Sequence, residues 1–195
     1  MVLRFWFAGP IVNALGPLGL LATSAVLAIV GLYLLSSASG LAMIFVFATL
    51  YGFGKTFFWP TTLGVVSEQC PKGGALTLNA IAGIGMLAVG ILGGPVIGKM
   101  TEDSIKASVE EATSADTYQK ISNDSTYFLG DYTAVDTSKI GDLPEEEQTK
   151  VQASMQTGKQ GSLASVAIFP VFMLACYLAL IFYFKGRGGY KPVEI

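Results

Sequence analysis

The chain has no histidine and only two cysteines among its 195 residues. The lack of histidine excludes histidine-based metal centres, Ser-His-Asp triads and histidine proton relays. Cys70 precedes a proline and Cys176 lies inside an apolar run, so the two thiols sit in different environments and give no disulfide framework. We therefore expect no metal site, no cofactor and two free thiols.

Charged residues are also scarce, at 13% of the chain against 52% hydrophobic residues. Of the 14 acids, 12 lie between Glu102 and Glu147, so the net charge of −2 mostly describes this one segment. No cluster of basic residues forms a face that would attract the phosphates of nucleic acid. The composition therefore excludes a nucleic-acid partner.

Long apolar runs make up most of the remaining chain. A bilayer core of roughly 30 Å needs about 20 mostly apolar residues at 1.5 Å of helical rise per residue. Four runs reach this length: Pro17–Ser36, Leu41–Val66, Gly74–Gly98 and Leu163–Phe184. A spanning backbone must satisfy its own polar groups, and these runs lack the alternation of a barrel strand, so they predict helices. The predicted fold class is an all-α membrane protein with four full transmembrane helices and a partial helix over residues 1–12.

The predicted organisation is membrane helices over residues 1–98, an external acidic loop over 99–162, and a last membrane helix with its tail over 163–195. With four spans, the basic residues at the termini and in the short loops fall on one side: Arg4, Lys72, Lys185, Arg187 and Lys191. The six lysines of the long segment 99–161 do not count against this, because long loops translocate largely regardless of charge. The short connection Ser37–Gly40 on the other side has no positive charge. The positive-inside rule then predicts a multi-pass protein of the cell (inner) membrane with a cytoplasmic C-terminus.

The acidic segment carries helix signals of its own. Thr101-Glu-Asp103 has the character of a helix start, and Ser108–Ile121 is rich in helix formers. Pro144-Glu-Glu-Glu147 places a proline and acids where a second helix would begin, to run as far as Gln156. We predict two short helices joined by an irregular stretch over residues 122–141. A disordered acidic loop is the alternative.

The second apolar run has a lysine, Lys55, near its middle. A lysine at the centre of a bilayer costs about 2.5–3.5 kcal/mol on insertion scales. The predicted cytoplasmic end at Val66 is roughly 16 Å away at helical rise, which is beyond the reach of a lysine side chain. None of the four runs contains a carboxylate, so this chain offers no intramembrane counter-ion for Lys55.

Helical spacing places polar and aromatic side chains on the same face as Lys55. With Lys55 they form the predicted substrate or coupling site: Tyr51, Phe58, Trp59 and Thr62. Pro60 frees the carbonyl of Thr56 from its helical hydrogen bond, so we expect the helix to kink or open there. Three interpretations of Lys55 stay open: a site residue in a polar cavity, an ion pair to a carboxylate outside this chain, or a tolerated charge.

The third run has glycines at the spacing that lets helices approach closely. Gly90, Gly94 and Gly98 recur every four residues, and Pro95 follows the second of them. The segment is predicted to serve either as a flexible gate or as a tight packing face. Pro170 gives the last run a second expected kink.

Three sets of residues together resemble a known family. Gly9, Asn13 and Gly16 have the spacing of a Gly-xxx-Asp-basic-Gly loop, with Asn13 in place of the acid. Gly90, Gly94, Pro95 and Gly98 are similar to a Gly-Pro signature of antiporters. Three phrases complete the set: Gly54-Lys-Thr-Phe-Phe-Trp-Pro60, Pro71-Lys-Gly-Gly74 and Gly188-Gly-Tyr-Lys-Pro192. In this order they resemble the C-terminal part of a major facilitator superfamily transporter, from the end of the eighth helix to the twelfth, and are similar to bacterial sugar-transporter-like members.

The resemblance implies a secondary active transporter and not an enzyme. The chain would be a C-terminal fragment that needs the N-terminal half of the transporter, and it would help to move a small solute, a sugar or a small organic anion, by alternating access. A small four-span membrane scaffold or sensor with an external binding loop is the alternative. A membrane-embedded enzyme is disfavoured because the spans hold no histidine, no acid and no nucleophile beside a base.

Overall fold

The computed structural model describes residues 2–127 and 130–193, and of residues 2–13 and 127 it describes the backbone alone. Within this part of the chain, four helices are long and apolar enough to cross a membrane: Ala14–Ser36, Leu41–Gln69, Pro71–Ala112 and Glu145–Gly186. The expectation of four such helices, made from the length of the apolar runs, is confirmed.

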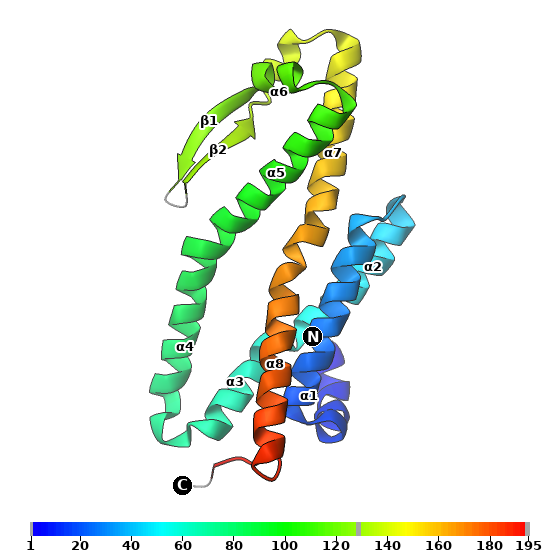
Figure 1. Ribbon diagram of the computed structural model, residues 1–195. Helices are drawn as coiled ribbons and strands as arrows, with labels where there is room; N and C mark the ends of the chain where they lie inside the picture. The colour runs from blue at the N-terminus through cyan, green and yellow to red at the C-terminus, as the bar shows by residue number, and fades with distance from the viewer. Residues whose placement is uncertain (1, 128–129, 194–195) are drawn as a thin grey trace. The chain divides into compact units, whose positions relative to one another are not determined.

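The elements follow one another as shown in Figure 1: α1 (Val2–Ser36), α2 (Leu41–Thr56), α3 (Phe58–Gln69), η1 (Pro71–Gly73), α4 (Gly74–Ala88), the π-helical turn η2 (Val89–Gly93), α5 (Gly94–Ala112), α6 (Ala115–Ile121), β1 (Ser122–Tyr127), β2 (Gly130–Val135), η3 (Lys139–Asp142), α7 (Glu145–Val166) and α8 (Ile168–Gly186). They divide into two compact units. Unit 1 comprises Met1–Met86 and Ala167–Ile195, and unit 2 comprises Leu87–Val166.

Helix α1 is the centre of unit 1, where it packs against α2, α3 and α8. A Cβ atom on Gly54 of α2 would lie 2.7 Å from the backbone nitrogen of Ala28, and one on Gly31 of α1 would lie 2.8 Å from the Cα of Tyr51. Both distances are shorter than side chains tolerate, so these two glycines permit the close crossing of α1 and α2. A non-helical residue at Gly16, with φ 67° and ψ 165°, separates the first turns of α1 from its apolar part.

Each of three prolines within the long helices follows a local irregularity. The helix is interrupted at Phe57 before Pro60 and at Ala167 before Pro170, and η2 directly precedes the turn that contains Pro95. Proline has no N–H for the preceding turn and its ring clashes with the carbonyl four residues earlier. The interruptions expected from Pro60 and Pro170 are therefore present.

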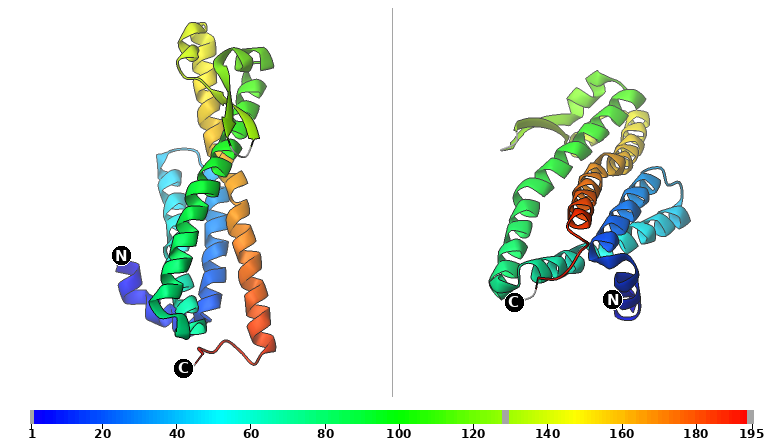
Figure 2. Two further views of the ribbon diagram at one scale, coloured as in Figure 1. Left: turned by 90° about the vertical axis from the view of Figure 1, so that its left-hand side faces the viewer. Right: turned by 60° about the horizontal axis from the view of Figure 1, so that its bottom comes forward.

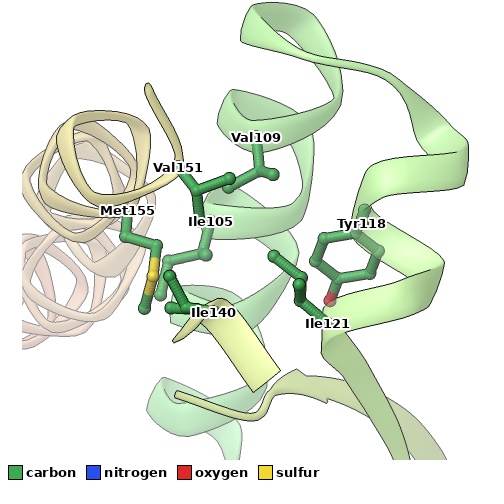
Figure 3. Packing of buried hydrophobic residues seen from close by; sticks show 7 residues of the cluster. All are labelled: Ile105, Val109, Tyr118, Ile121, Ile140, Val151 and Met155. Atoms are coloured by element: carbon green, nitrogen blue, oxygen red, sulfur yellow. The ribbon is translucent and has the colours of Figure 1, made fainter. Parts of the chain in front are cut away.

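Unit 2 is built on the antiparallel pair α5 and α7, which lie side by side in Figure 1 and Figure 2. Gly158 of α7 meets the backbone of α5, since a Cβ atom on it would lie 2.6 Å from the Cα of Ile105. Around this crossing, buried side chains from α5, α6, η3 and α7 form one apolar core (Figure 3): Ile105, Val109, Tyr118, Ile121, Ile140, Val151 and Met155.

A β-hairpin leaves the end of α6. Its two strands pair antiparallel, from Ser122 opposite Val135 to Tyr127 opposite Gly130. The hydroxyl of Tyr118 on α6 donates to the carbonyl of Thr133 at 3.3 Å and so ties the helix to β2. At the base of the hairpin, Asp136 accepts a 2.8 Å hydrogen bond from the side-chain amide of Asn123.

Three sequence-based expectations for the acidic segment need correction. The third apolar helix does not stop and restart at Thr101; α5 runs unbroken to Ala112, because nothing between Gly98 and Thr101 breaks a helix. The predicted helix Ser108–Ile121 is divided, with Ser114 as N-cap of α6, where its hydroxyl accepts a 3.1 Å hydrogen bond from the backbone of Thr117.

The third correction concerns the hairpin. The stretch 122–141 was expected to be irregular, and the fold was expected to be all-α, but β1 and β2 lie in this stretch. The strands carry little apolar alternation, so the sequence pattern does not predict their pairing, although Thr126, Tyr132, Thr133 and Val135 favour strands. The start of the last long helix after Pro144 was predicted correctly, with three acids in its first turn, but α7 extends beyond Gln156 to Val166.

Candidate functional site

The interruption between α2 and α3 is the most distinctive feature of the membrane-type helices. Phe57, the residue between the two helices, is 8% exposed and its carbonyl accepts a 3.1 Å hydrogen bond from the N–H of Thr61. Threonines flank the break on both sides: Thr56 donates to the carbonyl of Gly52 and Thr62 to that of Phe58, each at 2.7 Å. Threonines that bond back into the preceding turn bend helices, so they act in the same direction as Pro60.

Lys55 lies two residues before this break, and its side chain is exposed. Its neighbour Gly54 is buried against α1, so the lysine projects from another side of α2. Among the residues that the structure describes, Lys55 makes no ion pair and no side-chain hydrogen bond; the two ion pairs of that part of the chain lie in unit 2, Lys106 with Glu110 and Lys150 with Glu146. The lysine therefore has no counter-ion among the residues of unit 1 that the structure describes.

The other four predicted site residues do not all gather around Lys55. Tyr51 lies where α2 crosses Gly31 of α1. The indole of Trp59 is 48% exposed and its ring edge lies 3.4 Å from where a Cβ of Gly85 would be. Tyr51 thus faces α1, whereas Trp59 faces α4.

Phe58 and Thr62 face α8. The ring of Phe58 lies 6.4 Å from that of Tyr177, and the side chain of Thr62 lies near the Tyr177 hydroxyl. Tyr177 is not among the predicted site residues. Its hydroxyl lies within an apolar run, however, and a tyrosine hydroxyl in such surroundings usually has a hydrogen-bond partner. The contact links the segment just after the break to the last membrane-type helix.

An apolar cavity of about 410 Å³ lies between α1 and the α2–α3 segment. Its lining comes from both sides of the crossing: Leu15, Leu20, Thr23, Ser24, Leu27, Leu50, Phe53 and Phe57. The hydroxyl of Thr23 already donates to the carbonyl of Gly19 at 2.9 Å, so the wall offers few free polar atoms. Phe57 contributes to this wall from the break itself, a role that its sequence position did not reveal.

The segment that follows α8 is fastened to the end of α3. Tyr190 donates a 2.7 Å hydrogen bond from its hydroxyl to the carboxylate of Glu68, and the backbone N–H of Val193 donates to the carbonyl of the same residue at 2.9 Å. Gln69 donates from its side-chain amide to the carbonyl of Lys191 at 3.0 Å. We call these contacts the C-terminal clasp; neither the positive charges of this tail nor its Gly188-Gly-Tyr-Lys-Pro192 phrase predicts it.

The glycine face of the third membrane-type helix is open over much of its length. A Cβ atom on Gly90 or Gly98 would meet no heavy atom within 4 Å, and one on Gly94 would approach only its own helix, at the carbonyl of Val89. Gly94, Pro95 and Gly98 also line a cavity beside the hairpin. Their predicted role in packing or gating stays a prediction.

Comparison of the chain with protein-family models, with curated protein sequences and with solved structures found no match. The assignment of function therefore depends on the residues and the geometry described above.

Proposed function

We propose that this chain forms part of the wall of a solute pathway in a secondary active transporter of the major facilitator superfamily type. The observation that carries the proposal is Lys55, a cation with no ion pair within the described part of the chain, beside an interrupted helix whose apolar length suits a membrane span. Ionisable groups at such depth are costly and are kept where they meet a substrate, an ion or a partner charge. Interrupted helices near the midplane line the binding sites of secondary transporters.

The predicted substrate class follows from the side chains near the break. A lysine attracts an anionic group, and Trp59 offers an exposed aromatic face on which a sugar ring or an apolar body can stack. A sugar or a small organic anion fits this combination. Tyr51, Phe58 and Thr62 would act mainly by holding the broken segment against α1 and α8.

The proposed transporter needs further helices to complete the pathway. Helix α4 has no buried residue, and its exposed side chains include Leu76, at 80% exposure, and Met86, at 75%. Together with the open glycine positions on the same long helix, this surface supports contact with the N-terminal half of a transporter. The pathway would open in turn to each side of the cell (inner) membrane by alternating access, with the C-terminus in the cytoplasm.

Cysteine accessibility in the native membrane tests the proposal. Lys55→Cys is made in a protein that carries Cys70→Ser and Cys176→Ala, and its reaction with a hydrophilic methanethiosulfonate reagent is timed. Phe53→Cys is the matched control, since Phe53 lies at nearly the same depth but almost opposite Lys55 around the helix and lines the apolar cavity. We expect Lys55→Cys to react about tenfold faster or more, because only a hydrated thiol ionises readily. Equal, slow reaction at both positions would contradict a solute pathway at Lys55.

A membrane scaffold or sensor is the second candidate, and unit 2 favours it because this unit has its own buried core. The two candidates differ in the same experiment. A scaffold gives no reason for added solute to protect Lys55→Cys, whereas a transported solute should slow its modification.

A further inference from the structure

The cavity beside the hairpin lies wholly within unit 2. It has a volume of about 430 Å³ and lies between the first turns of α5 and strand β2, which runs back alongside that helix (Figure 1). Its lining combines small residues with two charges and an aromatic ring: Gly94, Pro95, Gly98, Lys99, Glu102, Gly130, Tyr132 and Ala134. A cavity of this size holds a small polar group but not a folded partner.

Two opposite charges line this cavity without neutralising each other. Lys99 and Glu102 lie three residues apart on α5 but do not form an ion pair, and among the described residues the lysine side chain has no hydrogen-bond partner. One oxygen of Glu102 accepts a hydrogen bond from the N–H of Val135 at 3.4 Å, which holds the carboxylate toward the hairpin. A ligand with one anionic and one cationic group would satisfy both side chains at once.

The order of the two charges along α5 gives the order of the charges in the ligand. The apolar run of the third membrane-type helix ends at Gly98, so Lys99 is the first charge beyond it. Glu102 follows about 4.5 Å further along the helix axis, at 1.5 Å of rise per residue. A ligand that matches both side chains has its anionic group at Lys99, close to the hydrocarbon, and its cationic group at Glu102, further out. A zwitterionic phospholipid head group has its charges in this order. Phosphate and amine are separated there by only the two carbons of ethanolamine.

We infer that this cavity binds the head group of an ethanolamine phospholipid, with its phosphate on Lys99 and its primary ammonium on Glu102. The free oxygen of Glu102 accepts N–H hydrogen bonds from the ammonium, and the ammonium of Lys99 donates to the phosphate. Tyr132 covers the head group from β2, in the interfacial position that tyrosine favours. The site is independent of the solute pathway at Lys55, which lies in unit 1.

A soluble ligand with the same phosphate and amine groups has the same chemistry, so the experiment must separate the two sources. The full chain is placed in phosphatidylcholine nanodiscs that contain equal amounts of phosphatidylethanolamine and phosphatidylglycerol, and the lipids retained after release are counted by native mass spectrometry. Soluble glycerophosphoethanolamine is added in a parallel arm as a competitor.

We expect selective retention of phosphatidylethanolamine, with about a tenfold loss of retention in Lys99→Gln and in Glu102→Gln, since each removes one charge-assisted hydrogen bond. Glu102→Gln keeps an oxygen that accepts from Val135, so the hairpin should stay in place. Lys120→Gln, an exposed lysine of α6 outside the cavity, is the matched control and should retain the lipid.

Equal retention of phosphatidylglycerol would overturn the inference, because that lipid has the phosphate but no amine. Unchanged retention in Lys99→Gln would do the same, and this variant alone decides the question if Glu102→Gln does not fold. Complete displacement by an equimolar amount of glycerophosphoethanolamine would overturn the lipid as the source and assign the site to a soluble zwitterion.

Discussion

The hydroxyl of Tyr190 donates a 2.7 Å hydrogen bond to the carboxylate of Glu68, a residue 122 positions earlier in the chain. Partial burial, followed by the hydrogen bond to Glu68 and then the negative charge of that residue, raises the pKa of Tyr190 to about 12. The hydrogen bond of the clasp therefore forms with the neutral tyrosine and disfavours its ionisation.

The first prediction concerns this clasp and its pH dependence. Because the folded pKa of Tyr190 lies above its ordinary value of about 10, the stabilisation is fully present below pH 10 and is lost as the pH rises toward 12. Tyr190→Phe should reduce the free energy of unfolding by about 1 kcal/mol at neutral pH, the usual value of one hydrogen bond. Thermal denaturation of both proteins as a function of pH measures the effect, and the difference between them should shrink at the alkaline end. A difference that stays constant through pH 12 would contradict the assigned pKa.

Gly54 gives a second prediction, on the crossing of α1 and α2. Gly54→Ala would place a Cβ atom 2.7 Å from the backbone nitrogen of Ala28 and 2.8 Å from the carbonyl oxygen of Ser24, so the helices must separate. We expect a loss of about 1–3 kcal/mol in stability, the range for overpacked sites. Gly52→Ala is the control two residues away, where a Cβ meets nothing within 4 Å. Similar melting temperatures for the two variants would show that α1 and α2 do not cross as described.

The core of unit 2 can be tested in the same way at Gly158. A Cβ atom there would lie 2.6 Å from the Cα of Ile105, whereas one on Gly161, a turn later, would lie 3.5 Å from the Oγ of Ser104 in ordinary contact. Gly158→Ala should therefore lower the free energy of unfolding by about 1–3 kcal/mol, and Gly161→Ala should leave it nearly unchanged. Hydrogen exchange at Val109 and Val151 reports on this unit separately, and equal protection in both variants would disprove the α5–α7 packing.

Substitution of Lys55 tests the proposed transport activity directly. In the complete transporter, Lys55→Gln should fold and insert normally, since removing the charge removes its desolvation cost, yet should reduce solute uptake by about tenfold or more. Lys55→Arg should restore little, because a guanidinium differs in shape and hydration and does not deprotonate. Trp59→Ala should mainly raise the apparent KM. Normal uptake by Lys55→Gln would show that the lysine is not part of the site and is a structural or tolerated charge.

The proposed orientation gives a last prediction, which reporter fusions can check. A reporter at Gly74 or after the C-terminus should lie in the cytoplasm, because Lys72, Lys185 and Arg187 lie on that side under the positive-inside rule. A reporter at Gly130 in the hairpin should lie outside. A cytoplasmic reading at Gly130 is incompatible with four spans.

Several features of this protein could be predicted because their causes are local in the sequence. The four membrane-type helices follow from the length of the apolar runs, and the interruption at Phe57 follows from Pro60 three residues later. The start of α7 follows from Pro144 and the acids after it. Each of these signals acts within one or two helical turns, so reading along the chain is enough to find it.

The tertiary structure decided what depends on residues far apart in the sequence. The GxxxG spacing predicts close helix packing at Gly90 and Gly98, yet the glycines that lie against another helix backbone include Gly54 and Gly158. The clasp of Tyr190 on Glu68 and the unpaired charges of one cavity were equally invisible in the sequence. A glycine is needed only where another backbone comes within contact distance, and a charge is satisfied only by what lies opposite it. Both conditions are set by how the helices pack, whereas the sequence by itself determined which segments became helices.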